Sequence, residues 1–306
     1  MPDESADWTI GRLIEWTRGF FEKKGIPQPR LEAEILLAHV LGRERIDLYM
    51  RYDESVGEDD RARLRELVRR RAGREPTRHL IGTCEFMSLA LKVTPDCLIP
   101  RPETELLVEE VLRMFGVKRR PAGAGAAGGA DPKPVTAIDL CTGCGCVAVS
   151  LAVYLPSARI AATDISAAAL AVARENAEGH GVADRIRFLE GDLFEPLDAA
   201  DVQPVDLLVA NPPYVAEAEW AALEPEIREH EPRAALVAGP TGTEVIERIV
   251  RGAPAYLKPG GTMLVEIGAE QGAAVAAKAP QVRGLGDVHV VKDYAGLDRL
   301  LAAKKI

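Results

Sequence analysis

The sequence of 306 residues has no uninterrupted apolar run that approaches the roughly 20 residues a membrane-spanning helix requires. This absence excludes an integral membrane protein. The first residues, Met1 to Ser5, are polar and acidic, whereas a secretory signal is basic and then apolar. We therefore expect a cytoplasmic protein that makes no membrane contact.

Positive charge is also in short supply. Lys and Arg number 38 against 47 Asp and Glu, which gives a formal net charge of -9. A field of this sign repels nucleic acid, although a local basic patch could still bind it. We expect no stable binding to DNA.

Cysteine is scarce, and its number is odd. Three of the five cysteines, Cys141, Cys144 and Cys146, fall in one short stretch, and Cys84 and Cys97 precede it. This distribution fits free thiols in a reducing compartment better than a disulfide framework. The stretch resembles metal-ligand spacing, but no fourth ligand follows at a convincing distance, so no metal site is predicted.

The chain from Trp8 to about Arg78 has apolar residues at helical spacing, with breaks at residues 25–27 and at Gly42. The pattern predicts a small helical domain over residues 1–80, with four or so helices. The last helix is rich in arginine. It indicates a solvated face or, as the alternative, a docking surface for an acidic or RNA-bearing partner.

Residues 86–99 alternate apolar and polar side chains in two short runs. This pattern is typical of a β-hairpin, and residues 81–100 are predicted to form a hairpin linker. A second domain follows over residues 101–306, and its first helix runs to about Phe115. The stretch from Arg119 to Pro134 is rich in Ala, Gly and Pro and predicts a flexible surface loop.

Beyond this loop, short β-branched runs alternate with helical segments. The alternation is typical of βαβ units and predicts an α/β, Rossmann-like fold with a parallel sheet covered on both faces. In such sheets, ligands bind at the carboxyl ends of the strands, near the point where strand order reverses. The predicted strands are Val135 to Leu140, Arg159 to Asp164, Arg185 to Leu189, Asp206 to Ala210 and Thr262 to Ile267.

The first strand leads into a loop rich in glycine and cysteine, and glycines at such a turn let the backbone approach a ligand closely. About 20 residues later, Asp164 closes the second strand and could accept hydrogen bonds from both ribose hydroxyls of an adenosine. Asp192 ends the third strand and could accept from the exocyclic amine of an adenine. The residues predicted to bind the nucleoside are Asp139, Cys141, Thr142, Gly143, Cys144, Gly145, Asp164, Asp192, Leu193 and Asn211.

The loop alone does not identify its ligand. Residues 143–148 also satisfy the G-x-G-x-x-G/A pattern of dinucleotide binders, so an NAD-type ligand remains an alternative. Asp139 argues against it, because a carboxylate here would repel a pyrophosphate. The same carboxylate could hold a charged amino-acid group, directly or through water. Adenosine with a cationic tail suits the loop better than a dinucleotide.

The fourth strand leads directly into Asn211-Pro212-Pro213-Tyr214. Two successive prolines fix the backbone and donate no hydrogen bond, so the Asn211 side chain and the Pro212 carbonyl form a rigid corner rich in acceptors. An amide or aromatic amine nitrogen is a poor nucleophile because its lone pair is delocalised. If its two N–H groups donate to this corner, the lone pair points at an electrophile. Tyr214 offers a flat face for stacking.

The electrophile that fits such a site is the methyl group on the sulfonium of S-adenosylmethionine, which leaves S-adenosylhomocysteine as product. Asn211, Pro212 and Tyr214 are then the predicted catalytic residues of a methyltransferase. Positioning of the two reactants can supply about 7 to 11 kcal/mol. The tetrapeptide alone does not separate a nucleobase from a side-chain amide as the acceptor.

Motifs spread over nearly the whole chain match one known family. Besides the loop and the tetrapeptide, they are Arg74-Glu75-Pro76, His79 to Gly82, Glu85-Phe86, Ser88-Leu89, Leu98 to Glu105, Glu231-Pro232-Arg233, Ala235-Leu236, Glu266-Ile267-Gly268 and Lys292-Asp293-Tyr294. In these residues the sequence resembles the HemK-type (PrmC) protein-glutamine N5-methyltransferases that modify peptide-chain release factors.

The resemblance implies a class I methyltransferase fold and a helical N-terminal domain that recognises the substrate. The implied substrate is the glutamine of a Gly-Gly-Gln motif in class 1 release factors. Asn211 and Pro212 would hold its amide, with Tyr214 and Phe86 on either side. The residues implied to bind the glutamine or to wall its pocket are Asn211, Pro212, Pro213, Tyr214, Phe86, Arg101 and Glu103.

Two related activities remain as alternatives. One branch methylates a glutamine of a large-subunit ribosomal protein, but it differs at the position of Pro102 to Glu105. DNA adenine-N6 methyltransferases share the tetrapeptide, but the acidic balance disfavours them. The chain also departs from the family pattern. Cys141 replaces the usual first loop glycine, which implies backbone strain if φ is positive there, and the insertion around residues 122–130 has no counterpart.

Overall fold

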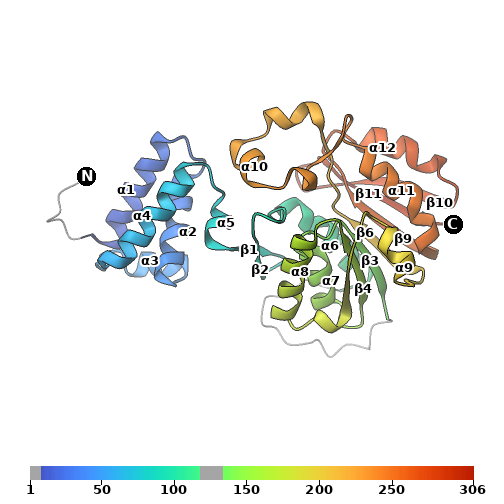
Figure 1. Ribbon diagram of the computed structural model, residues 1–306, viewed down its shortest axis with the longest axis horizontal. Coiled ribbons are helices and arrows are strands. Elements are labelled where there is room, and N and C mark those ends of the chain that lie inside the picture. The colour runs from blue at the N-terminus through green and yellow to red at the C-terminus, as the bar shows by residue number, and fades with distance from the viewer. Residues whose placement is uncertain (1–7, 118–133) are drawn as a thin grey trace. The chain divides into compact units, whose positions relative to one another are not determined.

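The computed structural model describes residues 8–117 and 134–306, which form two compact units (Figure 1). The first unit contains the chain up to Gly82 together with residues 224–230, and the second contains residues 83–223 and 231–306. Residues 118–133, which make up nearly all of the predicted Ala/Gly-rich loop, lie outside the described part. No helix in the described ranges combines the length and the apolar character that a membrane span needs.

The first unit is helical, as the sequence pattern predicted. Thr9 caps the first helix by accepting a hydrogen bond from the Arg12 N–H (3.3 Å). The buried residues of this helix recur at intervals of three and four, so that one stripe of side chains faces the core. The helices are α1 (Ile10–Lys23), α2 (Pro29–Leu41), α3 (Arg45–Met50), α4 (Glu58–Ala72), α5 (Thr77–Ile81) and α10 (Pro225–His230).

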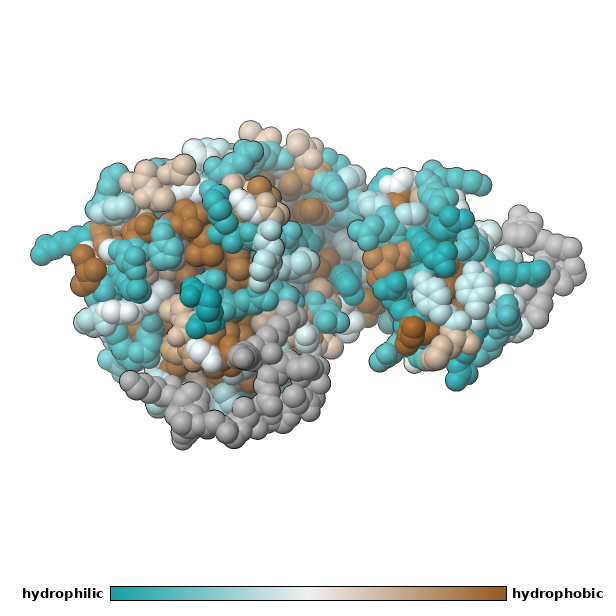
Figure 2. Space-filling model, turned by 180° about the vertical axis from the view of Figure 1, so that it is seen from behind, coloured by the Kyte–Doolittle hydropathy of each residue, from teal (hydrophilic) through white to brown (hydrophobic). Residues whose placement is uncertain are grey.

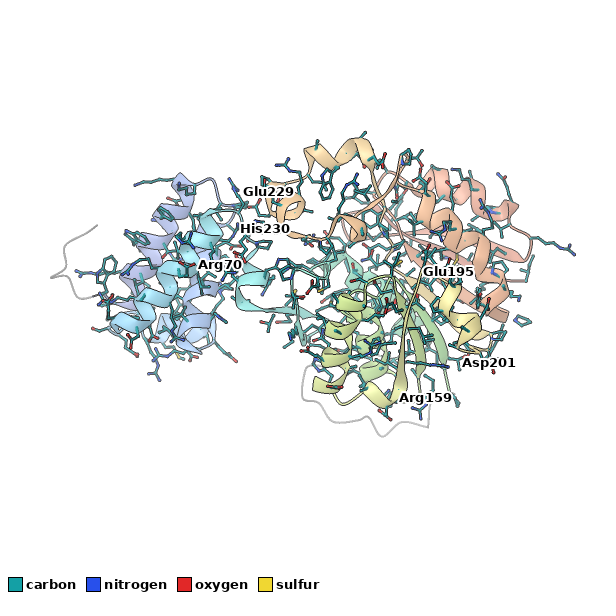
Figure 3. The ribbon with its side chains drawn as sticks, viewed as in Figure 1. Arg70, Arg159, Glu195, Asp201, Glu229 and His230 are labelled. Atoms are coloured by element: carbon teal, nitrogen blue, oxygen red, sulfur yellow. The ribbon has the colours of Figure 1, made fainter. Side chains whose placement is uncertain are left out.

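Most arginines of α4 and of the turn after it are paired with carboxylates of the same unit. Arg71 is 5% exposed and lies between Glu32 (3.0 Å) and Glu226 (3.2 Å). Arg74 also donates to Glu226 (3.1 Å), which holds α10 to this unit. Exposed arginines such as Arg70, which is labelled in Figure 3, are paired in the same way. The other pairs are Arg61 with Glu58, Arg63 with Asp60, Arg69 with Glu66 and Arg70 with Glu75.

This pairing bears on the two interpretations of the arginine helix. Hydrophilic residues dominate the face of the first unit that Figure 2 shows. Because the guanidinium groups are neutralised locally, they leave little net positive charge for an acidic partner or for RNA. The structure therefore favours a solvated, internally paired face.

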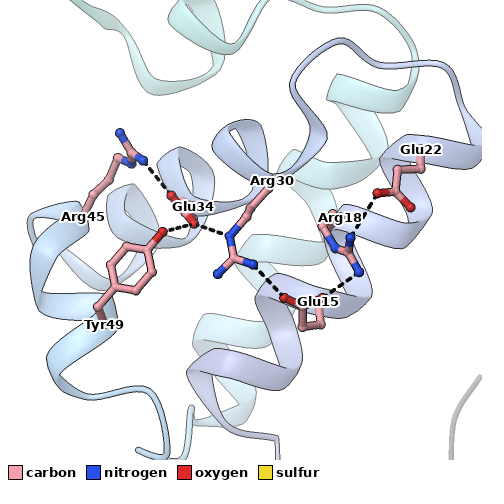
Figure 4. Close-up of polar contacts among 7 residues, drawn as sticks. All are labelled: Glu15, Arg18, Glu22, Arg30, Glu34, Arg45 and Tyr49. Atoms are coloured by element: carbon pink, nitrogen blue, oxygen red, sulfur yellow. Dashed lines mark hydrogen bonds and ion pairs between the residues drawn. The ribbon is translucent and has the colours of Figure 1, made fainter.

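A buried carboxylate on α2, Glu34, organises a polar network with α1 and α3 (Figure 4). It accepts hydrogen bonds from Arg30 Nε (3.0 Å), Arg45 (2.6 Å) and the Tyr49 hydroxyl (2.5 Å). Arg30 in turn donates to Glu15 on α1 (3.1 Å). Burial alone would raise the pKa of Glu34, but the hydrogen bonds from Tyr49, Arg45 and Arg30 hold it below its ordinary value.

We expect Glu34→Gln to destabilise the first unit by about 1 to 2 kcal/mol at pH 7, because the charge-assisted hydrogen bonds are weakened. A carboxylate whose pKa is lowered by folding contributes stability above its unfolded pKa of about 4.3, and this contribution is lost as the pH falls through the folded pKa. The free energies of unfolding of the wild type and the variant, measured with denaturant, should therefore differ at pH 7 and converge as the pH falls through the folded pKa of Glu34. A constant difference over that range would contradict this account.

The second unit is built on a seven-stranded sheet with the order β10-β11-β9-β6-β3-β4-β5 (Figure 1). The sequence pattern indicated only parallel strands, but β11 pairs antiparallel with both β9 and β10. The reason is the short link between β10 and β11, since a parallel pair needs a crossover of about a dozen residues or more. The strands are β3 (Thr136–Leu140), β4 (Arg159–Asp164), β5 (Ile186–Glu190), β6 (Val205–Ala210), β9 (Leu257–Glu266), β10 (Leu285–Lys292) and β11 (Asp298–Lys305).

Helices cover both faces of the sheet and bury a separate core on each. On one face lie α6 (Glu105–Met114), α7 (Cys146–Tyr154) and α8 (Ala167–Gly179). On the other lie α9 (Glu195–Ala199), α11 (Glu244–Tyr256) and α12 (Gly272–Lys278). From β3 the sheet continues through β4 on one side and β6 on the other, so strand order reverses between β3 and β6. Ligands of α/β sheets bind at this point.

The predicted hairpin is present, and its two strands lie between residues 83 and 92, inside the predicted range 81–100. Strands β1 (Thr83–Phe86) and β2 (Leu89–Lys92) pair antiparallel across Met87 and Ser88, whose φ values are 51° and 60°. Positive φ at both turn residues is typical of two-residue hairpins. The Lys92 N–H donates to Asn176 Oδ1 on α8 (2.7 Å), so the hairpin is part of the second unit.

Several short elements complete the second unit. Strands β7 (Val215–Ala216) and β8 (Val237–Gly239) pair in parallel and form a small sheet of their own. A 3-10 helix, η1 (Pro102–Thr104), leads directly into α6. The remaining 3-10 helices are η2 (Ala183–Arg185), η3 (Glu217–Ala222), η4 (Arg233–Ala235) and η5 (Ala279–Gln281).

Candidate active site

A cavity of about 390 Å³ lies at the carboxyl ends of β3, β4 and β6, where strand order reverses. Its wall combines the loop after β3, the end of β4, the turn after β5 and the tetrapeptide after β6. The residues predicted to bind a nucleoside therefore come together from four strand ends. Those that line the cavity are Asp139, Cys141, Thr142, Gly143, Cys144, Asp164, Asp192, Leu193 and Asn211.

The loop after β3 uses backbone conformations that favour glycine. Cys141, Gly143 and Gly145 have φ values of 59°, 57° and 81°. Gly145 is not part of the cavity wall. A Cβ there would lie 3.0 Å from the Ala173 Cβ, so this glycine allows the loop to pack closely on α8. The strain expected at Cys141 is present, and a left-handed conformation costs a residue with a side chain about 1 to 2 kcal/mol.

We expect valine at position 141 to be much less well tolerated than glycine. A β-branched side chain is disfavoured at positive φ, so Cys141→Val should cost about 2 kcal/mol relative to Cys141→Gly. Thermal unfolding and titration with S-adenosylhomocysteine would show the difference as a lower melting temperature and weaker binding for the valine variant. Equal behaviour of the two variants would contradict the strain inferred at this position.

Asp139 is the most buried carboxylate of the cavity, with 1% of its surface exposed. Its Oδ2 accepts hydrogen bonds from the Thr142 hydroxyl (2.6 Å) and the Ala148 N–H (3.2 Å). Burial raises the pKa of Asp139 to about 7 in spite of these bonds. A cation bound nearby would stabilise its ionised form.

Asp164 ends β4 with its carboxylate held in place by the backbone. It accepts hydrogen bonds from the Gly143 N–H (2.8 Å) and the Ser166 N–H (2.9 Å). Burial raises the pKa of Asp164, and these backbone hydrogen bonds oppose the shift. A carboxylate offers about four acceptor positions, so Asp164 can still accept from a ligand.

Asp192 differs from the other two carboxylates because it already has a charged partner. Arg248 on α11 donates to it at 2.7 Å, and both residues line the cavity. Arg248 is the only basic residue among the described residues of the wall, against the carboxylates Asp139, Asp164 and Asp192 and the further acid Asp96. This balance attracts a cation and disfavours the pyrophosphate of a dinucleotide.

The cysteines beside the cavity behave as small apolar residues. Cys97 and Cys144 are buried, and Cys141 and Cys146 are partly buried. The pKa of Cys97 is raised by its hydrogen bond with Cys144 and by burial, so this thiol stays protonated. Within the described ranges, no group of His, Cys, Asp and Glu is arranged to hold a metal ion.

Asn211 connects the end of β6 to the Pro102 to Glu105 element. Its Nδ2 donates to the Thr104 hydroxyl oxygen (3.0 Å), which leaves Oδ1 as an acceptor for a ligand. Asn211 and Pro213 line the cavity, and Pro212 between them is buried. The acceptor-rich corner predicted from the tetrapeptide thus lies beside the nucleoside-type loop.

Tyr214 is fixed at both ends. Its hydroxyl donates to Glu266 Oε1 (3.3 Å), and its carbonyl accepts from Gln271 Nε2 (2.8 Å). Burial, together with the nearby charge of Glu266, raises the pKa of Tyr214. The ring packs against the core and is not part of the cavity wall, so its stacking role stays a prediction.

Three further residues implied by the resemblance lie away from the cavity wall. Phe86 is 1% exposed and packs in the core under α6 and α7. Arg101 donates to the buried Glu231 (2.5 Å), which also accepts from the Ile99 N–H (3.1 Å). Glu103 is exposed on η1. In these positions Phe86 packs in the core and Arg101 pairs with Glu231, so both residues support the structure around the cavity.

Thr104 and Glu266 belong to the family motifs Leu98 to Glu105 and Glu266-Ile267-Gly268, but no role was predicted for either residue. Thr104 is fully buried and holds the Asn211 amide, and Glu266 is fully buried beside Tyr214. One signal was available for Glu266, since it is a carboxylate that ends an apolar strand next to β6.

Comparison with known proteins gives matches over both units. Residues 12–82 match the PrmC N-terminal domain, and residues 131–229 match the methyltransferase small domain. A release factor glutamine methyltransferase of Rhodopirellula baltica is 41% identical over 307 residues, with 100% of both chains covered. One of Geobacter sulfurreducens is 41% identical over 304 residues, with 99% of both chains covered.

Solved structures share the fold at low sequence identity. The N-terminal domain of human METTL16 in complex with SAH is 17% identical, with a TM-score of 0.50, over 71% of this chain and 76% of that one. The METTL16 catalytic domain in complex with a MAT2A 3'UTR hairpin gives a TM-score of 0.53 at 17% identity, over 71% and 75% of the chains. These likenesses show a methyltransferase-type α/β fold.

Proposed function

This chain belongs to the release factor glutamine methyltransferase family, and from that premise we propose the reaction that it catalyses. It transfers a methyl group from S-adenosylmethionine to the side-chain amide nitrogen of the glutamine in the Gly-Gly-Gln motif of class 1 peptide chain release factors. The reaction supports translation termination and takes place in the cytoplasm. The first unit serves in recognition of the release factor.

The observation that carries this proposal is the position of Asn211. Its amide lies between Thr104 and the cavity, with the amino group committed to Thr104 and Oδ1 left to accept. A primary amide offers two N–H donors and a lone pair spread over its π system. When one N–H donates to Asn211 Oδ1 and the other to the Pro212 carbonyl, the nitrogen is held with its face toward the cavity.

The carboxylates of the cavity fit S-adenosylmethionine. Asp164 would accept from the ribose hydroxyls, Asp192 and Leu193 would contact the adenine, and Asp139 would neutralise the cationic amino-acid end. The cofactor supplies a methyl group already activated by its sulfonium charge. The chain's own part is to orient the acceptor nitrogen, to exclude water with buried residues such as Pro212, and to balance charge.

An acceptor panel with radiolabelled S-adenosylmethionine tests this function. We expect label in a class 1 release factor and none in the same factor with the Gly-Gly-Gln glutamine replaced. Equal label in the mutated factor would contradict the proposal. A glutamine-bearing large-subunit ribosomal protein and duplex DNA complete the panel, and preferential labelling of either would show one of the related activities instead. The net charge of -9 predicts no stable complex with DNA.

A further inference from the structure

Glu266 is a fully buried carboxylate that the proposed mechanism does not yet use. It ends β9, it is 0% exposed, and its Oε2 has no hydrogen-bond partner among the described residues. Buried polar atoms are nearly always paired, because an unpaired one forfeits its hydration without replacement. A carboxylate kept here at such a cost requires an explanation beyond packing.

The groups around Glu266 come from separate elements. The Tyr214 hydroxyl, after β6, donates to Oε1 (3.3 Å), and the Thr104 hydroxyl on η1 lies near enough to lower the pKa of the carboxylate by hydrogen bonding. Arg299 on β11 lies close enough to stabilise the negative charge, although it is itself paired with Asp293 (2.9 Å). The negative charge of Glu103 on η1 disfavours ionisation of Glu266.

Thr104 is the link between Glu266 and Asn211. Its hydroxyl has one proton. When that proton is donated to Glu266, the Thr104 oxygen can only accept, so it must receive the Asn211 amino group. Asn211 then presents Oδ1 to the cavity. Without the carboxylate, Thr104 is free to donate to Oδ1, and the Asn211 amide can turn over and present its amino group to the substrate.

We propose that Glu266 is a positioning residue that acts through Thr104 to hold the Asn211 amide with its oxygen toward the substrate. The proposal rests on the proposed function, because it assumes an N–H donor as acceptor substrate. If the Asn211 amide were turned over, its N–H group would face an N–H group of the substrate amide, and no hydrogen bond could form between them. Glu266 therefore sets the fraction of molecules in which Asn211 Oδ1 faces the substrate. It touches neither substrate nor cofactor.

The protonation of Glu266 gives the proposal a measurable signature. Burial raises the pKa of Glu266 to about 7, against the opposing hydrogen bonds of Thr104 and Tyr214 and the charge of Arg299. A protonated Glu266 can donate to Thr104 and release the Thr104 proton toward Asn211. The kcat should therefore rise with pH through about 7 as Glu266 ionises.

The test measures kcat, KM for the release factor and S-adenosylhomocysteine binding for substitutions in both linked residues. Glu266→Ala and Thr104→Val should each lower kcat about 10- to 100-fold with little change in cofactor affinity. Thr104→Ser keeps the hydroxyl and should retain most of the activity. The double variant should be no worse than Thr104→Val alone, because both changes break the same link.

Glu266→Gln separates positioning from mere packing. Its neutral side chain resembles the protonated form of Glu266 and can donate to Thr104, so kcat should stay near the low-pH value of the wild type and lose the rise near pH 7. Asp206→Asn is the matched control, since Asp206 accepts from the Thr136 hydroxyl (2.8 Å) at the opposite end of β6 and should leave kcat unchanged. Wild-type kcat in Glu266→Ala, additive losses in the double variant, or an unaltered pH profile in Glu266→Gln would overturn the proposal.

The proposed function and the positioning role of Glu266 can be disproved separately. If the wild-type enzyme does not methylate the release factor, the proposed function is wrong. If it does, while the Glu266 and Thr104 variants behave independently, only the positioning role is wrong. Circular dichroism shows whether Glu266→Ala folds. If it does not, the same test is made with Thr104→Val, Thr104→Ser and Glu266→Gln.

Discussion

Replacing Asn211 by alanine is expected to lower kcat for release factor methylation by about 10²- to 10³-fold, the usual cost of removing one preorganised hydrogen-bonding group. The substitution removes the oxygen that holds the substrate amide and leaves the Thr104 hydroxyl without its donor. Single-turnover methyl transfer with saturating release factor measures the effect directly.

Two controls accompany this experiment. Titration with S-adenosylhomocysteine should show that the variant still binds the cofactor product within a few-fold of the wild type, so that the loss lies in the methyl-transfer step. Asp201→Asn, on an exposed turn after α9 in the second unit, should leave turnover unchanged. Activity in Asn211→Ala within a few-fold of wild type would remove the basis of the proposed mechanism.

Asp164→Ala is expected to abolish measurable cofactor binding, with the dissociation constant raised about 100-fold or more. Each hydrogen bond from a ribose hydroxyl to a carboxylate contributes about 1.5 to 3 kcal/mol. The substitution also strips the Gly143 and Ser166 N–H groups of their acceptor, so the loop after β3 loses an anchor. Calorimetric titration with S-adenosylhomocysteine tests the expectation.

Asp184→Ala is the matched control for this second prediction. Asp184 is an exposed carboxylate on η2 whose nearest cation, Arg159, is 3.8 Å away. Its removal should leave cofactor affinity unchanged. Unchanged affinity in Asp164→Ala would mean that the end of β4 does not hold the ribose and that the cofactor lies elsewhere in the cavity.

Much of the fold and part of the site could be predicted because they depend on local sequence. Short β-branched runs specify the parallel strands, and each strand brings its last residues to one edge of the sheet. The convergence of Asp139, Asp164 and Asn211 on one cavity follows from that rule. The positive φ of Cys141 was likewise implied by the glycine that the family pattern has at its place.

The rest depends on contacts between distant parts of the chain. Thr104 and Asn211 are 107 residues apart, and no local pattern marks the hydrogen bond between their side chains. The resemblance implied that Phe86 lies beside the substrate glutamine, but the pleat of the hairpin turns its ring into the core. Tertiary packing decides which face of a strand is buried, and the sequence of a short hairpin does not.

The ion pairs of the arginine-rich helix also depend on residues that are distant in the sequence. The run of arginines indicated a solvated face, with a docking surface as the alternative, and the structure pairs most of these arginines with carboxylates from α2, α4 and α10. The carboxylate of Glu226 lies more than 150 residues away in sequence from Arg71, so this pairing could not be anticipated. A purely RNA-binding role for this helix is correspondingly disfavoured.

The most direct test of the central claim is to locate the transferred methyl group by tandem mass spectrometry of a class 1 release factor incubated with this enzyme and S-adenosylmethionine. The account predicts a single methyl on the side-chain nitrogen of the glutamine in the Gly-Gly-Gln motif, dependent on Asn211. A methyl group on another residue, or on the glutamine in the absence of Asn211, would contradict it.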